Sequence, residues 1–239
     1  VYDNTSQDQV SMRVEEMASH PLDGAVVISA QLDEKDLRTL RSAPFPVVMV
    51  DASYDGFRSV GTDDRLGGEI AARHLLDMGH RRVGFIGEPM GQFGFVASSL
   101  RERGFRDAHR KAGHKVDDHL VRHGAHIRSA AKHLAIDLLS LPDPVTAIVA
   151  TSDVQAIGVM EAATELGISI PDDLSVIGYD DLEVAAFMGI TTVRQQLELS
   201  GQRGAAHLIE AINGDARYGA PEKLDVEVIV RNTTRPPGV

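Results

Sequence analysis

Apolar and polar positions recur along the chain with the periods of helices and strands, and the stretch 60–89 shows both. Residues 65–78 place their apolar side chains within one arc of a helix, as a helix that buries one stripe does. Asp63 or Asp64 can cap the start of this helix, and Gly79 can end it in a left-handed conformation. We therefore predict a complete helix with a defined start and stop.

A short apolar run at 83–86 follows that helix and is typical of a buried parallel strand. The same succession continues in both directions along the chain. Further strands are predicted at 25–28, 47–50, 147–150, 174–178 and 226–230, with residues 1–2 as the end of an earlier one. Further helices are predicted at 9–19, 32–42, 100–112, 129–141, 153–166 and 197–212, whereas 114–126 is expected to be a loop and 191–195 a short extended link.

Alternating helices and strands predict an α/β fold with parallel sheet and helices on both of its faces. In that architecture ligands bind beyond the carboxyl ends of the strands. The residues to inspect are therefore those directly after each strand, namely Ser29, Asp51, Gly87 with its loop, 151–153 and 179–181.

Length and amino-acid composition limit the kinds of domain and binding partner that this chain can have. The 239 residues suffice for one large α/β domain or for two lobes. Twenty-four basic against 35 acidic residues give a formal charge of −11, the wrong sign for a surface that follows a phosphate backbone, so this polypeptide should not bind DNA by itself. The absence of Cys excludes disulfides and fits a reducing compartment. No apolar run is long enough to cross a bilayer, and no signal peptide is visible, so we expect a soluble protein.

Most motifs that would indicate enzymatic chemistry are absent. The loop 87–94 matches no phosphate-binding pattern and carries the carboxylate of Glu88 where phosphate oxygens would lie. Asp180 and Asp181 could serve acid/base chemistry, but neighbouring side chains point apart, so at most one should enter a cleft. None of the ten His has the spacing of a zinc site, and His74, within an apolar stripe, is expected to be a core histidine rather than a ligand.

Arg101 is a more informative residue, because it shares a helical arc with Phe105 and Ala108 and so lies on the face that should be buried. A buried guanidinium requires an acceptor, and this one opens toward the expected ligand crevice. Two interpretations stay open: a ligand contact, or an internal ion pair with Asp or Glu.

Three segments together resemble the ligand-sensing core of the LacI/GalR family of bacterial transcription regulators. They are DDRLGGEIAARHLLDMGHRRVGFIGEP with RERGF at 101–105, TSDVQAIGVMEAATELGISIPDDLSVIGYDD, and ITTVRQQLELSGQRGAAHLI. The resemblance implies two Rossmann-like lobes with parallel sheets, joined by three crossovers near 61–63, 192–194 and 221–222, with an effector bound in the cleft. The implied lobes are 1–61 with 195–221, and 62–194 with 222–239.

The same resemblance implies a set of ligand-binding residues. They are Asp51 from the first lobe, Arg101, His126, Ser152 and Asp180 from the second, and Gln195 at a crossover. His126 stands where relatives often carry an aromatic side chain that stacks on a sugar, and Ser152 stands where Asn is common. The loop 91–99, with Phe93 and Phe95, is expected to line the cleft.

The chain also departs from the family pattern at its start. Relatives begin with a helix-turn-helix and a hinge, and their sensing core opens with a strand and a helix before the strand that ends at Tyr2. That strand would be central in the first lobe, and a sheet without it would leave backbone groups unpaired. We therefore expect an N-terminally truncated first lobe and a natural protein with more N-terminal sequence.

The function expected from these observations is that of the effector-binding and dimerisation part of a cytoplasmic transcriptional repressor. Its effector should be a small polar molecule, a sugar, and operator DNA should be bound only through an N-terminal domain outside this chain. No metal, cofactor, membrane or catalytic role is expected. Two alternatives remain: a periplasmic sugar-binding protein of an ABC transporter, and a hydrolase or transferase that uses Asp180 or Asp51.

Overall fold

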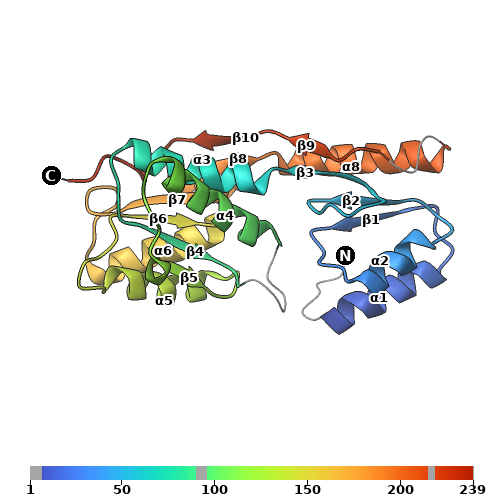
Figure 1. Cartoon of the computed structure of the whole chain (residues 1–239), viewed down its shortest axis with the longest axis horizontal. Helices are drawn as coiled ribbons and strands as arrows, with labels where there is room; N and C mark the ends of the chain where they lie inside the picture. The colour runs from blue at the N-terminus through green and yellow to red at the C-terminus, as the bar shows by residue number, and fades with distance from the viewer. Residues whose placement is uncertain (1–6, 90–95, 215–218, 239) are drawn as a thin grey trace. The chain divides into compact units, whose positions relative to one another are not determined.

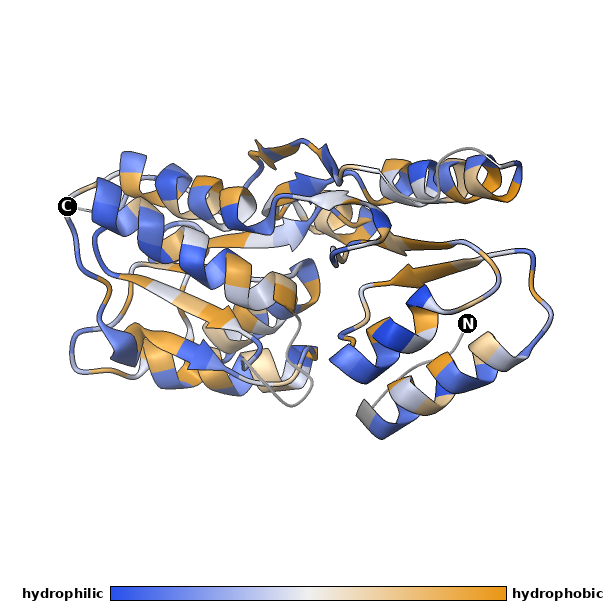
Figure 2. Cartoon of the chain, turned by 45° about the vertical axis from the view of Figure 1, so that its right-hand side comes forward, coloured by the Kyte–Doolittle hydropathy of each residue, from blue (hydrophilic) through white to orange (hydrophobic). Residues whose placement is uncertain are grey.

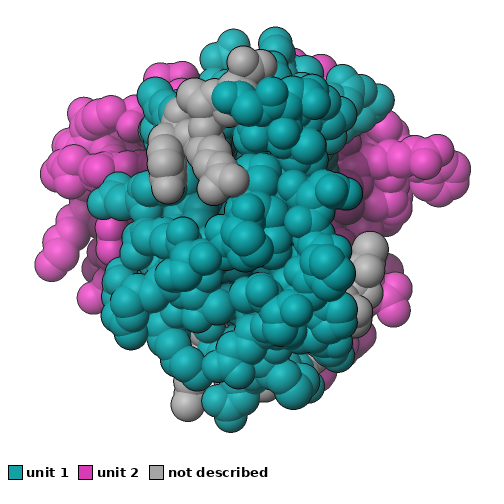
Figure 3. Space-filling model, turned by 90° about the vertical axis from the view of Figure 1, so that its right-hand side faces the viewer, with its two compact units in different colours: residues 1–62, 91–95, 196–225 teal, residues 63–90, 96–195, 226–239 magenta. Residues whose placement is uncertain are grey.

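A computed structural model of the chain describes residues 7–89, 96–214 and 219–238. The chain forms two compact units (Figure 3). Unit 1 comprises residues 1–62, 91–95 and 196–225, and unit 2 comprises residues 63–90, 96–195 and 226–239. Among the described helices, none is both long and apolar enough to span a bilayer.

Unit 1 is built on a parallel sheet with the strand order β1-β2-β3-β9 (Figure 1). Its elements are α1 (Gln7–Ser19), β1 (Ala25–Ile28), α2 (Glu34–Arg41), β2 (Val47–Val50), β3 (Arg58–Thr62), α8 (Leu197–Ile212) and β9 (Glu222–Leu224).

The two faces of this sheet are covered by different helices. Met49 packs in the same cluster as Leu37 and Leu40 of α2, whereas the next residue, Val50, packs with Leu199 of α8. Successive side chains of a strand point to opposite faces, so the apolar run at 47–50 is buried on both sides.

Unit 2 contains a larger sheet with the order β10-β8-β7-β6-β4-β5, in which β10 is antiparallel to β8 and the other pairs are parallel. Its elements are α3 (Asp64–Asp77), β4 (Val83–Gly87), α4 (Val96–Lys111), the 3-10 turn η1 (Asp118–Leu120), β5 (Val121–His123), α5 (Arg128–Leu139), β6 (Ala147–Ala150), α6 (Asp153–Leu166), β7 (Ser175–Asp180), α7 (Glu183–Met188), β8 (Thr191–Gln195) and β10 (Val226–Ile229).

Alternate residues of the unit 2 strands build two cores. Phe85 packs on the α3 and α4 side with Leu75, whereas Ile86 packs on the α5 and α6 side with Leu138 and Val159. Several strands of this sheet are mainly orange in Figure 2, whereas the flanking helices carry both colours. The α/β class with predominantly parallel sheets is therefore confirmed.

Several expected elements need correction. The segment 114–126 is not loop throughout, because it contains η1 and β5, and 191–195 is a full strand that pairs with β7 and β10. Residues 96–99, expected to be loop, are the first turn of α4. The expected strand end at 1–2 and the remainder of the loop 91–99 that precedes α4 lie outside the described residues.

Candidate functional site

Polar side chains gather at one edge of the unit 2 sheet, where its parallel strands end. They are Glu88 after β4, His126 after β5, Thr151 and Ser152 after β6, Asp180 at the end of β7 and Gln195 at the end of β8. Parallel strands bring their carboxyl ends to the same edge, so residues far apart in the sequence meet there.

Arg101 of α4 connects several members of this group. Its Nε donates to Asp64 Oδ1 at 2.8 Å, and its Nη1 donates to the Thr151 carbonyl at 2.6 Å. The guanidinium carbon lies 3.6 Å from the centre of the Tyr179 ring, and Nη1 lies 3.9 Å from Asp180 Oδ1. Burial alone would lower the pKa of Arg101, but Asp64, Tyr179 and Asp180 outweigh it and raise that pKa. The internal ion pair anticipated for Arg101 is therefore present, and the same guanidinium also faces Asp180.

Close packing of α3 on α4 sets the position of Arg101. A Cβ on Gly68 would lie 2.0 Å from the Arg101 carbonyl oxygen, and one on Gly104 would lie 1.9 Å from the Arg65 carbonyl oxygen. Only glycine permits such an approach of two backbones. The approach brings the first turn of α3, with Asp64, against the Arg101 side chain.

Asp180 and Asp181 face different partners, as the strand geometry predicts. Asp180 Oδ1 accepts a hydrogen bond from Gln195 Nε2 at 2.5 Å, and burial raises the Asp180 pKa against the opposing effects of Arg101 and Gln195. Asp181 instead pairs with Arg194 at 2.7 Å and Arg231 at 2.6 Å, and these two hydrogen bonds hold its pKa low despite its desolvation. Of these two residues, Asp180 therefore belongs to the polar group at this edge, and Asp181 is structural.

Backbone strain gathers at strand ends. Among the described residues, the non-glycine positions with positive φ are Ser29 (49°), Asp51 (52°), Asp180 (111°) and Asp181 (61°), each at the end of β1, β2 or β7. Such conformations cost free energy and are common in binding sites. Asp51, in unit 1, accepts a hydrogen bond from Ser200 Oγ at 3.1 Å.

His126 and Glu88 are in contact at the same edge. His126 Nδ1 contacts Glu88 Oε1, and Glu88 is only 6% exposed. The hydrogen bond to Glu88 raises the His126 pKa above its ordinary value, despite partial burial. Burial would raise the Glu88 pKa, but hydrogen bonds from His126 and Ser98 lower it.

Ser152 has a clear structural role. It is fully buried and is the N-cap of α6, where its Oγ accepts from the Gln155 backbone N–H at 3.2 Å. An N-cap of this kind stabilises a helix by about 1 kcal/mol. Ligand contact by Ser152 stays a prediction.

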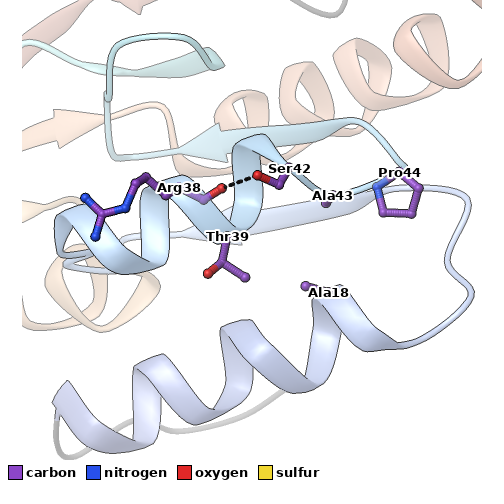
Figure 4. A pocket seen from close by; sticks show the side chains of 6 residues that line it. All are labelled: Ala18, Arg38, Thr39, Ser42, Ala43 and Pro44. Atoms are coloured by element: carbon purple, nitrogen blue, oxygen red, sulfur yellow. Dashed lines mark hydrogen bonds between the residues drawn. The ribbon is translucent and has the colours of Figure 1, made fainter.

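A shallow hollow of about 410 Å³ lies in unit 1 between α1 and α2 (Figure 4). It is lined by Ala18, Arg38, Thr39, Ser42, Ala43 and Pro44. The Ser42 hydroxyl donates to the Arg38 carbonyl, so it closes the last turn of α2 instead of facing outward.

Within the described part of the chain, no group of three or more His, Asp or Glu side chains could hold a metal ion. The strand-end group of unit 2 is therefore the better candidate site.

The sequence singled out five residues of unit 2 and one of unit 1. Arg101, Asp180 and Gln195 are joined in one network, His126 pairs with Glu88 beside it, Ser152 caps α6, and Asp51 belongs to unit 1. His74 is partly buried and has a hydrogen-bond partner, which agrees with the expected structural role: burial lowers its pKa and its Nε2 lies 3.0 Å from Thr234 Oγ1.

Glu88 and Tyr179 were missed as functional partners, although both stood in the strand-end segments to inspect. The signal that could have found Glu88 is an acidic residue and a histidine that follow adjacent strands. This signal is weak in the sequence because β5, the strand before His126, has only three residues.

Comparisons with known proteins agree with this geometry. The model of the periplasmic binding protein-like domain family matches residues 72–234. The HTH-type transcriptional repressor PurR of Haemophilus influenzae (strain PittEE) is 28% identical over 241 residues, which cover 97% of this chain and 71% of PurR.

Solved structures give the same result. The transcriptional regulator CelR in complex with cellobiose has a TM-score of 0.85 at 28% identity, covering 95% of this chain and 71% of CelR. A LacI family regulator from Enterococcus faecalis V583 with bound ribose has a TM-score of 0.83 at 27% identity, covering 94% of this chain and 82% of that regulator. Because the family model spans more than half of the 239 residues, the chain belongs to the periplasmic binding protein-like domain family, in the form found in LacI-family transcription regulators.

Proposed function

We propose that this chain is the effector-sensing part of a LacI-family transcriptional repressor, and that its effector is a neutral, polyhydroxylated small molecule of the sugar class. The observation that carries the proposal is the pair formed by Arg101 and Asp180 at the strand ends of unit 2. The solved relatives hold cellobiose and ribose, which supports a sugar as the ligand class. Binding without turnover is the proposed activity.

The chemistry of the edge suits hydroxyl groups. A sugar hydroxyl both donates and accepts, and the site offers a guanidinium donor and a carboxylate acceptor side by side. The carboxylates of Glu88, Asp64 and Asp180 outnumber the cations Arg101 and His126 at this edge, which disfavours an anionic ligand.

Asp51 is proposed as a further ligand contact supplied by unit 1. Its strained backbone and its place after β2 support this role. Gln195 and Ser152 are proposed as secondary ligand contacts. The Gln195 amide already donates to Asp180, and the Ser152 hydroxyl already caps α6.

A homodimer is proposed as the working state in the cytoplasm, with operator DNA bound through an N-terminal domain outside this chain. Two-fold operators require two-fold proteins. In α7, Phe187 is 90% exposed and its neighbours Val184 and Met188 are partly exposed, which suits burial against a second copy. Light scattering of the chain and of Phe187→Glu tests this: a monomeric parent chain contradicts it, and a monomeric variant of a dimeric parent supports it.

A thermal-shift screen tests the proposed ligand class. Ribose, cellobiose and other sugars are compared with nucleobases and with sugar phosphates at equal concentration. A ligand at 100 times its Kd stabilises the folded state by about 2.7 kcal/mol, which is readily measured. The proposal predicts stabilisation by at least one neutral sugar. Stabilisation by nucleobases or phosphates alone contradicts it.

A further inference from the structure

Glu88 and His126 form a contact between a buried carboxylate and a more exposed imidazole. Glu88 lies directly after β4 with 6% of its surface exposed, and His126 lies in the loop between β5 and α5 with 40% of its side chain exposed. The acid is therefore inside the protein and the imidazole is at the surface of the site.

The other polar groups in contact with Glu88 do not neutralise its carboxylate. Ser98 Oγ accepts from the Glu88 backbone N–H at 2.9 Å, Thr151 Oγ1 lies 3.3 Å from Glu88 Oε2, and Gln155 Nε2 lies 3.4 Å from Glu88 Oε1. All three are uncharged. Hydrogen bonds from neutral groups offset only part of the cost of burying a carboxylate.

The nearby guanidinium is already engaged. Arg101 gives its Nε to Asp64 and its Nη1 to the Thr151 carbonyl, so it acts on Glu88 only through its field. Among the described residues, the group that contacts Glu88 directly and can carry a positive charge is thus His126. A buried carboxylate with one cationic partner keeps that partner protonated.

We propose that Glu88 is a positioning and specificity-determining residue, which holds the His126 imidazole charged and oriented. The site then presents a second cationic donor, beside Arg101, to the hydroxyl oxygens of its effector. The identity of the ligand in this inference rests on the proposed function, whereas the charge state of His126 is independent of it.

The charged groups that face His126 act in both directions. Glu88 from β4 and Asp180 from β7 raise the His126 pKa, whereas Arg101 from α4 and partial burial lower it. Glu88 is the dominant contributor, because it alone makes a hydrogen bond to the imidazole among these groups. Removal of the Glu88 charge should therefore reverse the direction of the shift.

The first test needs no ligand. The imidazole resonances of the ten histidines are followed by NMR as a function of pH, and His126 is assigned by its loss in His126→Gln. The expected His126 pKa lies above the ordinary 6.5 in the parent chain and at or below it in Glu88→Gln. The matched control is Glu102→Gln, which removes the acid 2.8 Å from His123 and should leave the titration of His126 unchanged.

The parent chain alone can overturn the proposal, so the test does not depend on the folding of Glu88→Gln. A His126 pKa at or below 6.5 in the parent contradicts it, and so does an unchanged His126 pKa in a folded Glu88→Gln.

The second test uses ribose as the probe, by calorimetry at several pH values. Affinity should fall in the parent chain as the pH rises through the His126 pKa, and Glu88→Gln should bind weakly with little pH dependence. Equal affinity of both proteins across the range overturns the role in specificity. Failure of ribose to bind at any pH, with the His126 titration as expected, contradicts the proposed ligand and leaves the Glu88 assignment supported.

Discussion

At the scale of single residues, Arg101 should carry a large share of the stability of unit 2. Arg101→Ala leaves Asp64 without its ion pair and the Thr151 carbonyl without its donor. Removal of one partner from a buried pair costs about 3 to 5 kcal/mol. Urea denaturation of the apo protein should show a loss of this size, whereas Arg128→Ala, which breaks an exposed pair with Glu161, should cost about 1 kcal/mol or less. Equal losses in the two variants would show that Arg101 is not a structural centre.

Asp153 should make the free energy of unfolding depend on pH, and the direction of its pKa shift gives the sign. It is fully buried, with Thr192 Oγ1 at 2.6 Å and the Leu182 N–H at 2.8 Å, and burial raises its pKa from 3.8 to about 6. The folded state therefore binds a proton more tightly than the unfolded state, so the contribution of Asp153 to stability falls as the pH rises from 3.8 to about 6. Two pKa units correspond to roughly 3 kcal/mol as an upper estimate.

The measurement is the free energy of unfolding of the parent chain minus that of Asp153→Asn, from pH 4 to pH 7. This difference should shift in favour of the variant as the pH rises. Asp181→Asn provides the opposite sign, because Arg231 and Arg194 hold the Asp181 pKa low against desolvation, and its contribution is lost as the pH falls. A flat difference for Asp153→Asn would mean that the folded protein does not raise this pKa.

At this scale the sequence predicted much of the site. Strand-end logic pointed to Asp180, and helical periodicity placed Arg101 on a buried face, where its partners lie. It could not choose between ion pair and ligand contact, because the choice depends on the distance between α3 and α4. The sequence could not show the contact of Glu88 with His126, because that contact depends on the pairing of β4 with β5.

At the scale of elements, the close packing of α3 on α4 positions Arg101. Gly104→Ala would place a Cβ 1.9 Å from the Arg65 carbonyl, and backbone at that distance must move. Overpacking of this kind costs about 1 to 3 kcal/mol. Gly201→Ala in α8 is the matched control, because nothing lies within 4 Å of its added Cβ. The control should gain about 0.5 to 1 kcal/mol in thermal or urea unfolding through helix propensity. A neutral Gly104→Ala would show that the helices have room to separate.

The apolar pattern was sufficient for the longer helices and for strands that are continuous apolar runs. The strand at 147–150 and the helix at 197–212 were predicted at the bounds that the structure has. The strands β3, β5 and β9 were not predicted as strands, because each contains a single large apolar side chain and is defined by its neighbours in the sheet. A run such as Val121–His123 carries too few residues to show a period of two.

At the scale of the whole molecule, we expect effector binding to act as a switch that changes the relation of the two units. If Asp51 of one unit and Arg101 with Asp180 of the other contact the same ligand, the ligand must favour the arrangement in which all contacts are made. The absence of Cys allows clean spin labelling at Asp23→Cys in unit 1 and Asp137→Cys in unit 2, both exposed positions. Saturating sugar should change the distance distribution between the labels. An unchanged distribution would exclude this switch.

The most direct test of the central claim is calorimetric titration of the sugar that stabilises the protein most, with the parent chain, Asp180→Asn and Asp143→Asn. Asn tolerates the positive φ of residue 180 and keeps the size of the side chain, while it removes the charge and replaces one acceptor oxygen with an NH2 donor. Asp143 is an exposed control in the same unit. Loss of a charge-assisted hydrogen bond of about 1.5 kcal/mol or more corresponds to a Kd at least about tenfold weaker. The account predicts that weakening for Asp180→Asn and none for Asp143→Asn. Equal affinity of all three proteins would contradict it, because the effector would then bind away from the strand ends of unit 2.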